Sequence, residues 1–229
     1  MATDSPTPPH RDVAVLVPAA GRGVRLGGPT PKALRDLAGE PLLVHCCRNL
    51  AAAPSVGLIV VAAPADAVEQ VRALVPRAIV VPGGEHRQES VARALAAVPE
   101  NFQIILVHDA ARALAPPPLI EAVAQAVRDG HDAVIPGLPV VDTIKQVAPD
   151  DQVVATVDRS QLRAVQTPQG FRRSLLIKAH RAATDAHTDD AGLVERMGVP
   201  VHTVPGHPHA LKITTPWDLV VAEAILRAG

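Results

Sequence analysis

The chain has very few aromatic side chains and almost no cysteine. Its 229 residues include one Trp, two Phe and no Tyr, so aromatic residues make up 1% of the sequence. The core must therefore be built from Val, Leu, Ile and Ala, and base stacking on aromatic rings is not expected. The two cysteines, Cys46 and Cys47, are adjacent within a helical pattern, where a disulfide between them would strain the backbone. We expect both to be reduced thiols in the core.

A large net charge and a long apolar segment are also missing. The 22 basic and 23 acidic residues give a formal net charge of -1, which supplies no long-range field for attracting nucleic acid or an anionic membrane. Pro, Asp or Arg interrupts every apolar run before it reaches the roughly 20 residues of a membrane helix. Residues 1–12 are polar and Pro-rich and do not follow the basic-then-apolar order of a secretory signal. We predict a disordered tail over residues 1–12, a cytoplasmic protein, and no nucleic-acid or membrane partner.

Short β-branched runs alternate with helical patterns over most of the chain, which is typical of a parallel sheet flanked by helices. Strands are predicted at residues 13–17, 58–62, 79–81, 104–107, 133–135 and 201–204, and helices at 42–52, 66–74, 89–98, 118–128, 173–183, 191–197 and 216–227. Two further strand-like runs, 142–147 and 152–157, flank a strong turn signal at Ala148-Pro149-Asp150-Asp151, which predicts a β-arm over roughly residues 138–160. We therefore predict a single α/β domain over residues 13–229.

The strongest local signal is a glycine loop directly after the first predicted strand. Its glycines and the cations around it are Gly21, Gly23, Gly27, Arg22, Arg25 and Lys32. Glycines let backbone N–H groups approach an anion closely, and a parallel sheet places such a loop at the edge where ligands bind. The spacing fits neither a dinucleotide fingerprint nor a P-loop. The clustered cations favour a triphosphate, although the loop alone is equally consistent with a turn that carries solvated cations.

Two further segments place polar groups at strand ends. Asp109 follows the strand at 104–107, where a divalent cation that bridges phosphate oxygens would be held, or where it could cap a helix. Arg112 could bind a second phosphate, or form a surface ion pair. Residues 82–90 join two glycines to a helix start. Backbone donors and the Ser90 hydroxyl there could read a base edge, or simply form a turn and cap the helix.

Weaker signals lie at residues 142–145, 157–159, 166–170, 188–190 and 211–214. In order and spacing from residue 13 to 225, the whole set resembles the 2-C-methyl-D-erythritol 4-phosphate cytidylyltransferase family of non-mevalonate isoprenoid synthesis. The resemblance implies a Rossmann-like, mostly parallel sheet flanked by helices, with a protruding β-arm that clasps the second subunit of a homodimer. It also implies Mg2+ as cofactor and transfer of CMP from CTP to 2-C-methyl-D-erythritol 4-phosphate, which gives 4-diphosphocytidyl-2-C-methyl-D-erythritol and pyrophosphate.

The same resemblance implies roles for individual residues. Arg25 and Lys32 would be the catalytic pair that stabilises the α-phosphate transition state, and Asp109 would coordinate the metal. The implied nucleotide-binding residues are Ala19, Ala20, Gly21, Gly23, Gly84, Glu85, Ser90, Asp109 and Ala110. The implied residues for the methylerythritol phosphate are Arg112, Thr167, Thr188 and Lys212, with Thr143 and Arg159 contributed by the partner's arm.

Three alternatives stay open at this point. A sibling enzyme could transfer CMP to another pentitol phosphate such as D-ribitol 5-phosphate, since only the acceptor pocket would differ. An NAD-dependent dehydrogenase is disfavoured by the missing glycine fingerprint. A non-catalytic nucleotide sensor is disfavoured by the presence of both Arg25 and Lys32. Because a phosphate nucleophile is already ionised, the reaction requires no general base, and none of the ten histidines has a required role.

Overall fold

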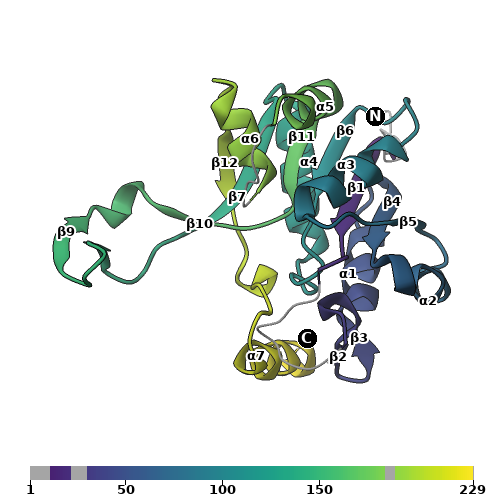
Figure 1. Cartoon of the computed structure of the whole chain (residues 1–229), viewed down its shortest axis with the longest axis horizontal. Coiled ribbons are helices and arrows are strands. Elements are labelled where there is room, and N and C mark those ends of the chain that lie inside the picture. The colour runs from purple at the N-terminus through teal and green to yellow at the C-terminus, as the bar shows by residue number, and fades with distance from the viewer. Residues whose placement is uncertain (1–10, 22–29, 184–188, 229) are drawn as a thin grey trace, which may run out of the picture.

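A mixed eight-stranded sheet forms the centre of the molecule (Figure 1). The computed structural model describes residues 11–21, 30–183 and 189–228. The strands of this sheet are β1 (Val13–Pro18), β4 (Val56–Ala63), β5 (Ile79–Pro82), β6 (Ile104–Val107), β7 (Ala133–Pro139), β10 (Arg163–Val165), β11 (Gln169–Arg172) and β12 (His202–Pro205). Their order is β10-β7-β11-β6-β1-β4-β5, and β12 pairs with β7.

The sheet is mostly parallel, as predicted. β1 pairs in parallel with both β4 and β6, β5 extends the parallel set beyond β4, and β12 runs parallel to β7. β11 runs antiparallel between β6 and β7, and β10 is antiparallel to β7. Neither β10 nor β11 was predicted, because their sequences, Arg-Ala-Val and Gln-Gly-Phe-Arg, lack the apolar β-branched runs that marked the other strands.

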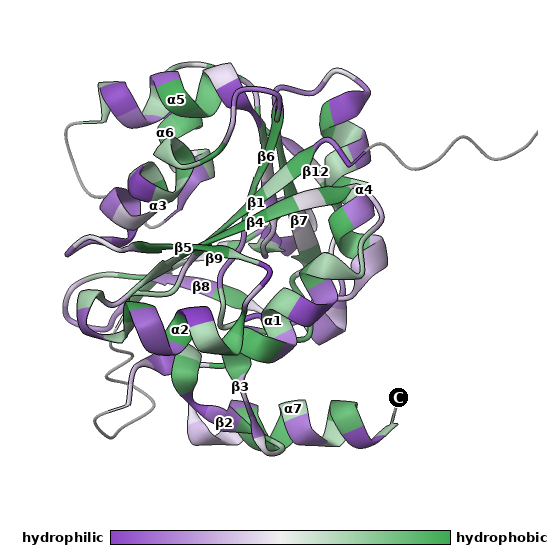
Figure 2. Ribbon diagram, turned by 90° about the vertical axis from the view of Figure 1, so that its right-hand side faces the viewer, coloured by the Kyte–Doolittle hydropathy of each residue, from purple (hydrophilic) through white to green (hydrophobic). Residues whose placement is uncertain are grey.

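Helices cover both faces of the sheet (Figure 2). They are α1 (Leu42–Ala51), α2 (Val68–Leu74), α3 (Arg87–Ala96), α4 (Pro117–Arg128), α5 (Arg173–Ala182), α6 (Asp190–Arg196) and α7 (Pro216–Ala228). α1 and α4 pack on one face, and α3, α5 and α6 pack on the other. Within the described ranges, no helix has the length and apolar character that crossing a bilayer requires. Each predicted helix is present in the structure. The helix predicted at 66–74 is divided, because residues 65–67 form a separate 3-10 turn before α2.

Alternation along β1 explains why both faces need helices. Val13, Val15 and Val17 belong to the core shared with α1 and α4, whereas Ala14 and Leu16 belong to the core under α3, α5 and α6. Side chains of successive strand residues point to opposite faces, so a strand that is apolar throughout must be covered twice. As the composition predicted, the core is aliphatic: of the aromatic rings, only that of Phe171 is fully buried in the described chain. Cys46 and Cys47 are buried free thiols.

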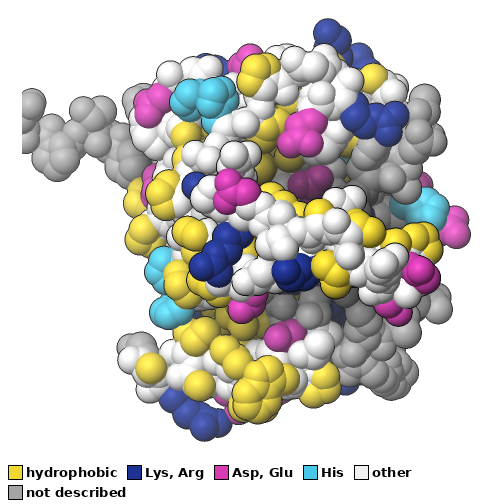
Figure 3. Space-filling view, turned by 90° about the vertical axis from the view of Figure 1, so that its left-hand side faces the viewer, with side chains coloured by type: hydrophobic (Ala, Val, Ile, Leu, Met, Phe, Trp, Pro, Cys, Tyr) yellow, Lys and Arg dark blue, Asp and Glu magenta, His cyan; other side chains and the backbone are white. Residues whose placement is uncertain are grey.

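The predicted arm is a separate two-stranded sheet that projects from the body of the molecule (Figure 1). It consists of β8 (Ile144–Val147) and β9 (Val153–Val157), paired antiparallel. Four valines of the arm are exposed: Val141, Val147, Val153 and Val154. Apolar side chains are visible along the arm on the face that Figure 3 presents.

The remaining elements are short. The strands β2 (Asp36–Leu37) and β3 (Glu40–Pro41) pair with each other, and 3-10 turns occupy Lys32–Leu34, Arg159–Gln161 and Pro208–Ala210.

Close packing of α4 on β11 generates a stability prediction. A Cβ added at Gly170 would lie 2.7 Å from Cγ1 of Val123 and 2.9 Å from Cγ2 of Val127, closer than the roughly 3.5–4.0 Å of an ordinary carbon contact. Both valines are buried, so α4 would have to move. We expect Gly170→Ala to lower the free energy of unfolding by about 1–3 kcal/mol, measured by urea denaturation followed by circular dichroism. The control is Ser174→Ala on the exposed face of α5, and equal stability of the two variants would contradict the prediction.

Candidate active site

The loops that follow β1, β5 and β6 meet around a pocket of about 260 Å³. Its lining comprises Pro18, Ala19, Ala20, Gly21, Lys32, Ala33, Gly84, Glu85, His86, Arg87, Ser90, Asp109, Ala110, Ala111 and Lys212. The three loops lie at the carboxyl ends of parallel strands, which is where open α/β sheets bind ligands. Every predicted nucleotide-binding residue that the structure describes lies in this lining, and so do Lys32 and Lys212.

Backbone hydrogen bonds tie two of these loops to the end of β4, which lies between β1 and β5. The N–H of Ala19 donates to the carbonyl of Ala62 (2.8 Å), and the N–H of Gly83 donates to the carbonyl of Ala63 (2.7 Å). A Cβ at position 83 would lie 2.5 Å from the Cβ of Ala20. Glycine is therefore needed at this position so that the loop after β5 can lie against the loop after β1.

The Ser90 hydroxyl organises the start of α3. It accepts the Gly84 N–H at 3.0 Å and donates to the His86 carbonyl at 3.1 Å. Nearby, the Glu85 N–H donates to the Glu89 carboxylate at 2.9 Å. The Ser90 side chain thus shapes the loop from inside and is itself buried.

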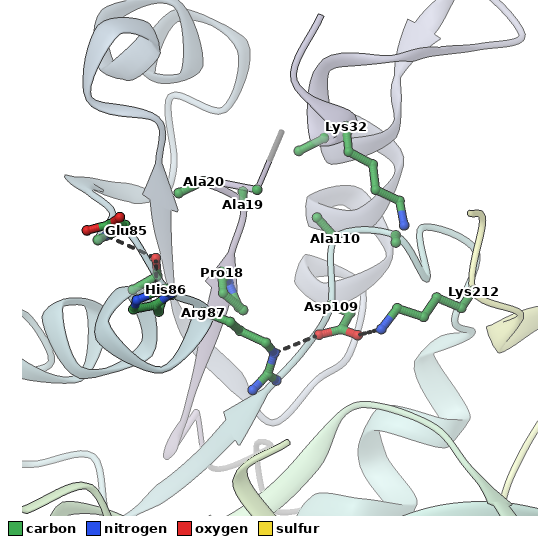
Figure 4. Close-up of a pocket in the computed structure, with 15 residues that line it drawn as sticks. Pro18, Ala19, Ala20, Lys32, Glu85, His86, Arg87, Asp109, Ala110 and Lys212 are labelled. Carbon is green, nitrogen blue, oxygen red and sulfur yellow. Dashed lines mark hydrogen bonds and ion pairs between the residues drawn. The ribbon is translucent and has the colours of Figure 1, made fainter. Parts of the chain in front are cut away.

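Asp109 lies between two cations at the centre of the pocket (Figure 4). Its Oδ1 is 3.3 Å from Nε of Arg87, and its Oδ2 is 2.8 Å from Nζ of Lys212. Burial alone would raise the pKa of this carboxyl, but the charges of Arg87 and Lys212 hold the pKa well below its usual range. Asp109 is therefore an anion in the free protein. The helix-cap alternative is wrong, because the next helix along the chain begins only at Pro117.

Lys212 is positioned by a backbone link to the same loop. The N–H of its neighbour Ile213 donates to the carbonyl of Ala111 at 2.8 Å. Lys32 reaches the pocket from a separate segment, and its side chain points into the same space (Figure 4). The structure thus brings together lysines 180 positions apart in the sequence.

Arg87 also binds a second carboxylate. Its Nη1 lies 2.7 Å from Oδ2 of Asp190, and Oδ1 of Asp190 lies 2.9 Å from Nε2 of His180. Arg87, His180 and Asp190 were not among the predicted site residues. Arg87 and Asp190 are 103 positions apart, and no local pattern marks the pair.

Arg112 and Thr167 lie behind Asp109. The Thr167 hydroxyl accepts the Asp109 N–H at 3.0 Å. The Arg112 guanidinium donates to the carbonyls of Ala210 (2.6 Å) and Val165 (3.1 Å). Within the described residues the Arg112 guanidinium binds these backbone carbonyls, which argues against the alternative of a surface ion pair.

Two predicted acceptor residues lie away from this pocket. Thr143 and Arg159 are exposed on the arm, where Arg159 donates to the carbonyl of Val141. Gly23, Arg25 and Thr188 lie outside the described residues.

Comparison with known proteins identifies the family. Residues 13–228 match the family model described as 2-C-methyl-D-erythritol 4-phosphate cytidylyltransferase. The chain belongs to this family. A cytidylyltransferase of that name from Streptomyces avermitilis is 52% identical, with 99% of this chain and 96% of the relative covered. Another, from Saccharopolyspora erythraea, is 56% identical, with 93% and 99% covered.

Solved structures of the cytidylyltransferase family share the fold. The 2-C-methyl-D-erythritol 4-phosphate cytidylyltransferase of Thermus thermophilus superimposes with a TM-score of 0.78 at 38% identity, over 94% of this chain and 99% of that one. The resemblance inferred from the motifs is confirmed, and the dehydrogenase alternative is not supported.

A buried histidine of this cytidylyltransferase generates a pH prediction. Nε2 of His108 is 3.3 Å from the Arg112 carbonyl, which can only accept, so this nitrogen carries the proton. Nδ1 then accepts from the Thr167 hydroxyl at 3.1 Å. Burial lowers the pKa of His108 to about 4, against about 6.5 in an unfolded chain. Between these two pH values the unfolded state binds more protons, so stability falls as the pH falls through this window.

We expect this effect to remove about 3 kcal/mol of unfolding free energy between pH 7 and pH 4. His108→Gln keeps one donor and one acceptor but cannot titrate, so its stability should fall by that much less over the same range. Urea denaturation at several pH values measures the difference, with exposed His131→Gln as control. Parallel curves for the wild type and His108→Gln would contradict the prediction.

Proposed function

We propose that this chain transfers CMP from CTP to 2-C-methyl-D-erythritol 4-phosphate, giving 4-diphosphocytidyl-2-C-methyl-D-erythritol and pyrophosphate. The observation that carries the proposal is the pocket of a member of this family: Lys32, Lys212 and the Asp109 carboxylate face one space that Gly21 also lines. Residues 13–229 act in this proposal as one nucleotidyltransferase domain.

The reaction is an in-line displacement. An oxygen of the acceptor phosphate attacks the α-phosphorus of CTP, the bond from that phosphorus to the oxygen of the leaving pyrophosphate breaks, and a new diphosphate linkage forms. The attacking oxygen is already ionised, so catalysis consists of positioning and charge stabilisation. We assign the charge stabilisation at the α-phosphate to Arg25 and Lys32. A buried neutral His108 is consistent with a reaction that needs no general base.

The nucleotide lies between the loops after β1 and β5 in this proposal. Backbone groups of the glycines Gly21 and Gly23 approach the phosphates, and the residues that hold cytosine and ribose are Ala19, Ala20, Gly84, Glu85 and Ser90. The hydrogen bonds of Ser90 to Gly84 and His86 support a loop that is already shaped before the base binds. Recognition through the backbone suits a pocket whose lining contains no Phe, Tyr or Trp.

Asp109 and Ala110 lie where the triphosphate would pass, and we assign Asp109 as the protein ligand of Mg2+. Among the described residues, no group of three or more His, Cys, Asp or Glu side chains could hold a metal. One carboxylate is nevertheless sufficient, because Mg2+ is commonly held by one or two carboxylates together with substrate phosphates and water. The bound ion would neutralise phosphate charge in the transition state.

The acceptor is proposed to bind at a site shared between two subunits. Arg112, Thr167, Thr188 and Lys212 come from one subunit, and Thr143 and Arg159 come from the arm of the other. Support comes from the arm itself, which projects from the body and carries four exposed valines that a second copy could cover. The cytoplasm is the proposed location, since Cys46 and Cys47 are free thiols of the kind that a reducing compartment maintains.

Pyrophosphate release tests the proposal. The protein is supplied with CTP and Mg2+, and 2-C-methyl-D-erythritol 4-phosphate is compared with D-ribitol 5-phosphate as acceptor. We expect release with the branched acceptor, because the family model and the named relatives carry that substrate in their names. Preference for ribitol phosphate would keep the chemistry and change the acceptor, whereas release with neither would support the sensor alternative.

Mixed dimers test the shared site. Loss of one electrostatic donor in Lys32→Ala should lower kcat by roughly a hundredfold or more, and Arg159→Ala should remove an acceptor contact. Dimers that carry one chain of each variant hold one site with both defects and one with neither, so some activity should return. Differently tagged chains, purified for both tags, provide the measurement. No recovery in such verified mixed dimers would place Arg159 in its own chain's site or outside any site.

A further inference from the structure

The two cations that bracket Asp109 are anchored in different ways. Lys212 contacts Oδ2 of Asp109, and its side chain is 45% exposed. Arg87 contacts Oδ1 of Asp109 through Nε, and its side chain is 26% exposed. Nη1 of Arg87 also binds Asp190 at 2.7 Å. The guanidinium fork of Arg87 is therefore shared between two carboxylates.

Asp190 is a rigid anchor. Its side chain is 1% exposed, and its second oxygen binds Nε2 of His180 at 2.9 Å. Burial alone would raise the pKa of Asp190, but the His180 hydrogen bond and the charge of Arg87 lower it overall. Asp190 is thus a buried anion with a partner on each oxygen.

The start of α6 is also tied to the sheet, which fixes Asp190 in space. Gln169 in β11 donates to the Asp189 carboxylate at 2.7 Å and accepts the Ala191 N–H at 3.1 Å. Asp189 also caps α6 by accepting the Gly192 N–H at 3.1 Å. These bonds link Arg87, at the start of α3, to the central sheet through a buried carboxylate.

We propose that Arg87 is a positioning residue for the metal-bound triphosphate: tethered by Asp190, its guanidinium orients the Asp109 carboxylate without occupying it fully. The inference rests on the proposed function, since it assumes that Asp109 holds the metal. An arginine without a tether could bind Asp109 through two parallel hydrogen bonds, the strongest geometry for this pair, and would then compete with a cation for both oxygens. In the position that the Asp190 contact fixes, Arg87 makes a single hydrogen bond to Asp109 in the described chain, the 3.3 Å contact from Nε.

The variant Arg87→Lys separates the effect of the positive charge from the effect of the hydrogen-bond geometry of the guanidinium. A single ammonium keeps the positive charge, but it does not have the planar fork that spans two carboxylates. In Arg87→Lys, Asp109 therefore either keeps its Lys212 contact but loses the contact that orients Oδ1, or pairs with an ammonium that Asp190 does not anchor. Both states weaken metal binding.

Mn2+ binding tests this role of Arg87 without relying on turnover. Electron paramagnetic resonance measures the binding in the presence of saturating CTP. We expect Arg87→Lys to raise the half-saturating Mn2+ concentration by about tenfold, the lower end of the range for groups that orient metal ligands. The matched control is Arg72→Lys, whose arginine forms an ion pair with exposed Glu69 on α2; it should bind Mn2+ as the wild type does. In steady-state assays, excess Mg2+ should restore the kcat of Arg87→Lys, which a purely structural defect would not allow.

Asp190→Asn provides a second test, because it keeps an acceptor oxygen and removes the charge that holds Arg87. It should shift Mn2+ binding in the same direction, and thermal unfolding measured in parallel identifies any loss of fold. If Asp190→Asn does not fold, the Mn2+ affinity of Arg87→Lys alone tests the inference. Wild-type Mn2+ affinity in folded Arg87→Lys would overturn the inference and leave the proposed function intact. Absence of CTP-dependent Mn2+ binding in the wild type would instead overturn the assigned metal site and the inference together.

Discussion

The parallel pairing of β1 with β4 on one side and β6 on the other is the constraint on which the pocket depends. The register aligns Leu16 with both Val60 and Val107, so the loops that follow β1 and β6 leave the same edge of the sheet, with β1 extending two residues beyond the end of β6. Hydrogen bonds from Ala19 and from His108 extend both pairings by one step. Because β1 is buried on both faces, this register is fixed by packing as well as by hydrogen bonds.

Electrostatics in the pocket follows from that framework. The Asp109 carboxylate at the end of β6 lies in a pocket with three cations from separate segments, Lys32, Arg87 and Lys212. This local charge does not depend on the net charge of the whole chain. The cations differ in what holds them: Lys212 belongs to a loop bonded to Ala111, whereas Arg87 is held by the buried Asp190. An arrangement in which several cations surround the Asp109 carboxylate suits a ligand that carries several negative charges and brings a cation with it. The two lysines and Arg87 therefore distinguish this pocket from the glycine-fingerprint site of a dinucleotide enzyme.

Much of the fold could be predicted from the sequence, because β1, β4 and β6 are runs of mostly apolar residues and the main helices show a clear helical period. β10 and β11 could not, since their existence depends on pairing with β6 and β7, which local residues do not encode. In the site, glycines and strand-end charges marked the pocket correctly. The roles of Ser90 and Arg112 could not be predicted in full, because a sequence does not reveal that a hydroxyl or a guanidinium already binds the protein's own backbone. The Arg87–Asp190–His180 set was missed because its members come from α3, α6 and α5.

The arm has a consequence for how this protein would respond to dilution. Thr143 and Arg159 lie on a hairpin outside the central sheet, whereas the pocket proposed for the nucleotide is lined by residues of one chain. If the acceptor site is shared between subunits as proposed, a separated subunit would keep a complete pocket for CTP. It would lose only the partner's contacts to the acceptor. Specific activity would then depend on protein concentration, whereas the affinity for the nucleotide would not. Each chain would turn over the acceptor only while the dimer lasts.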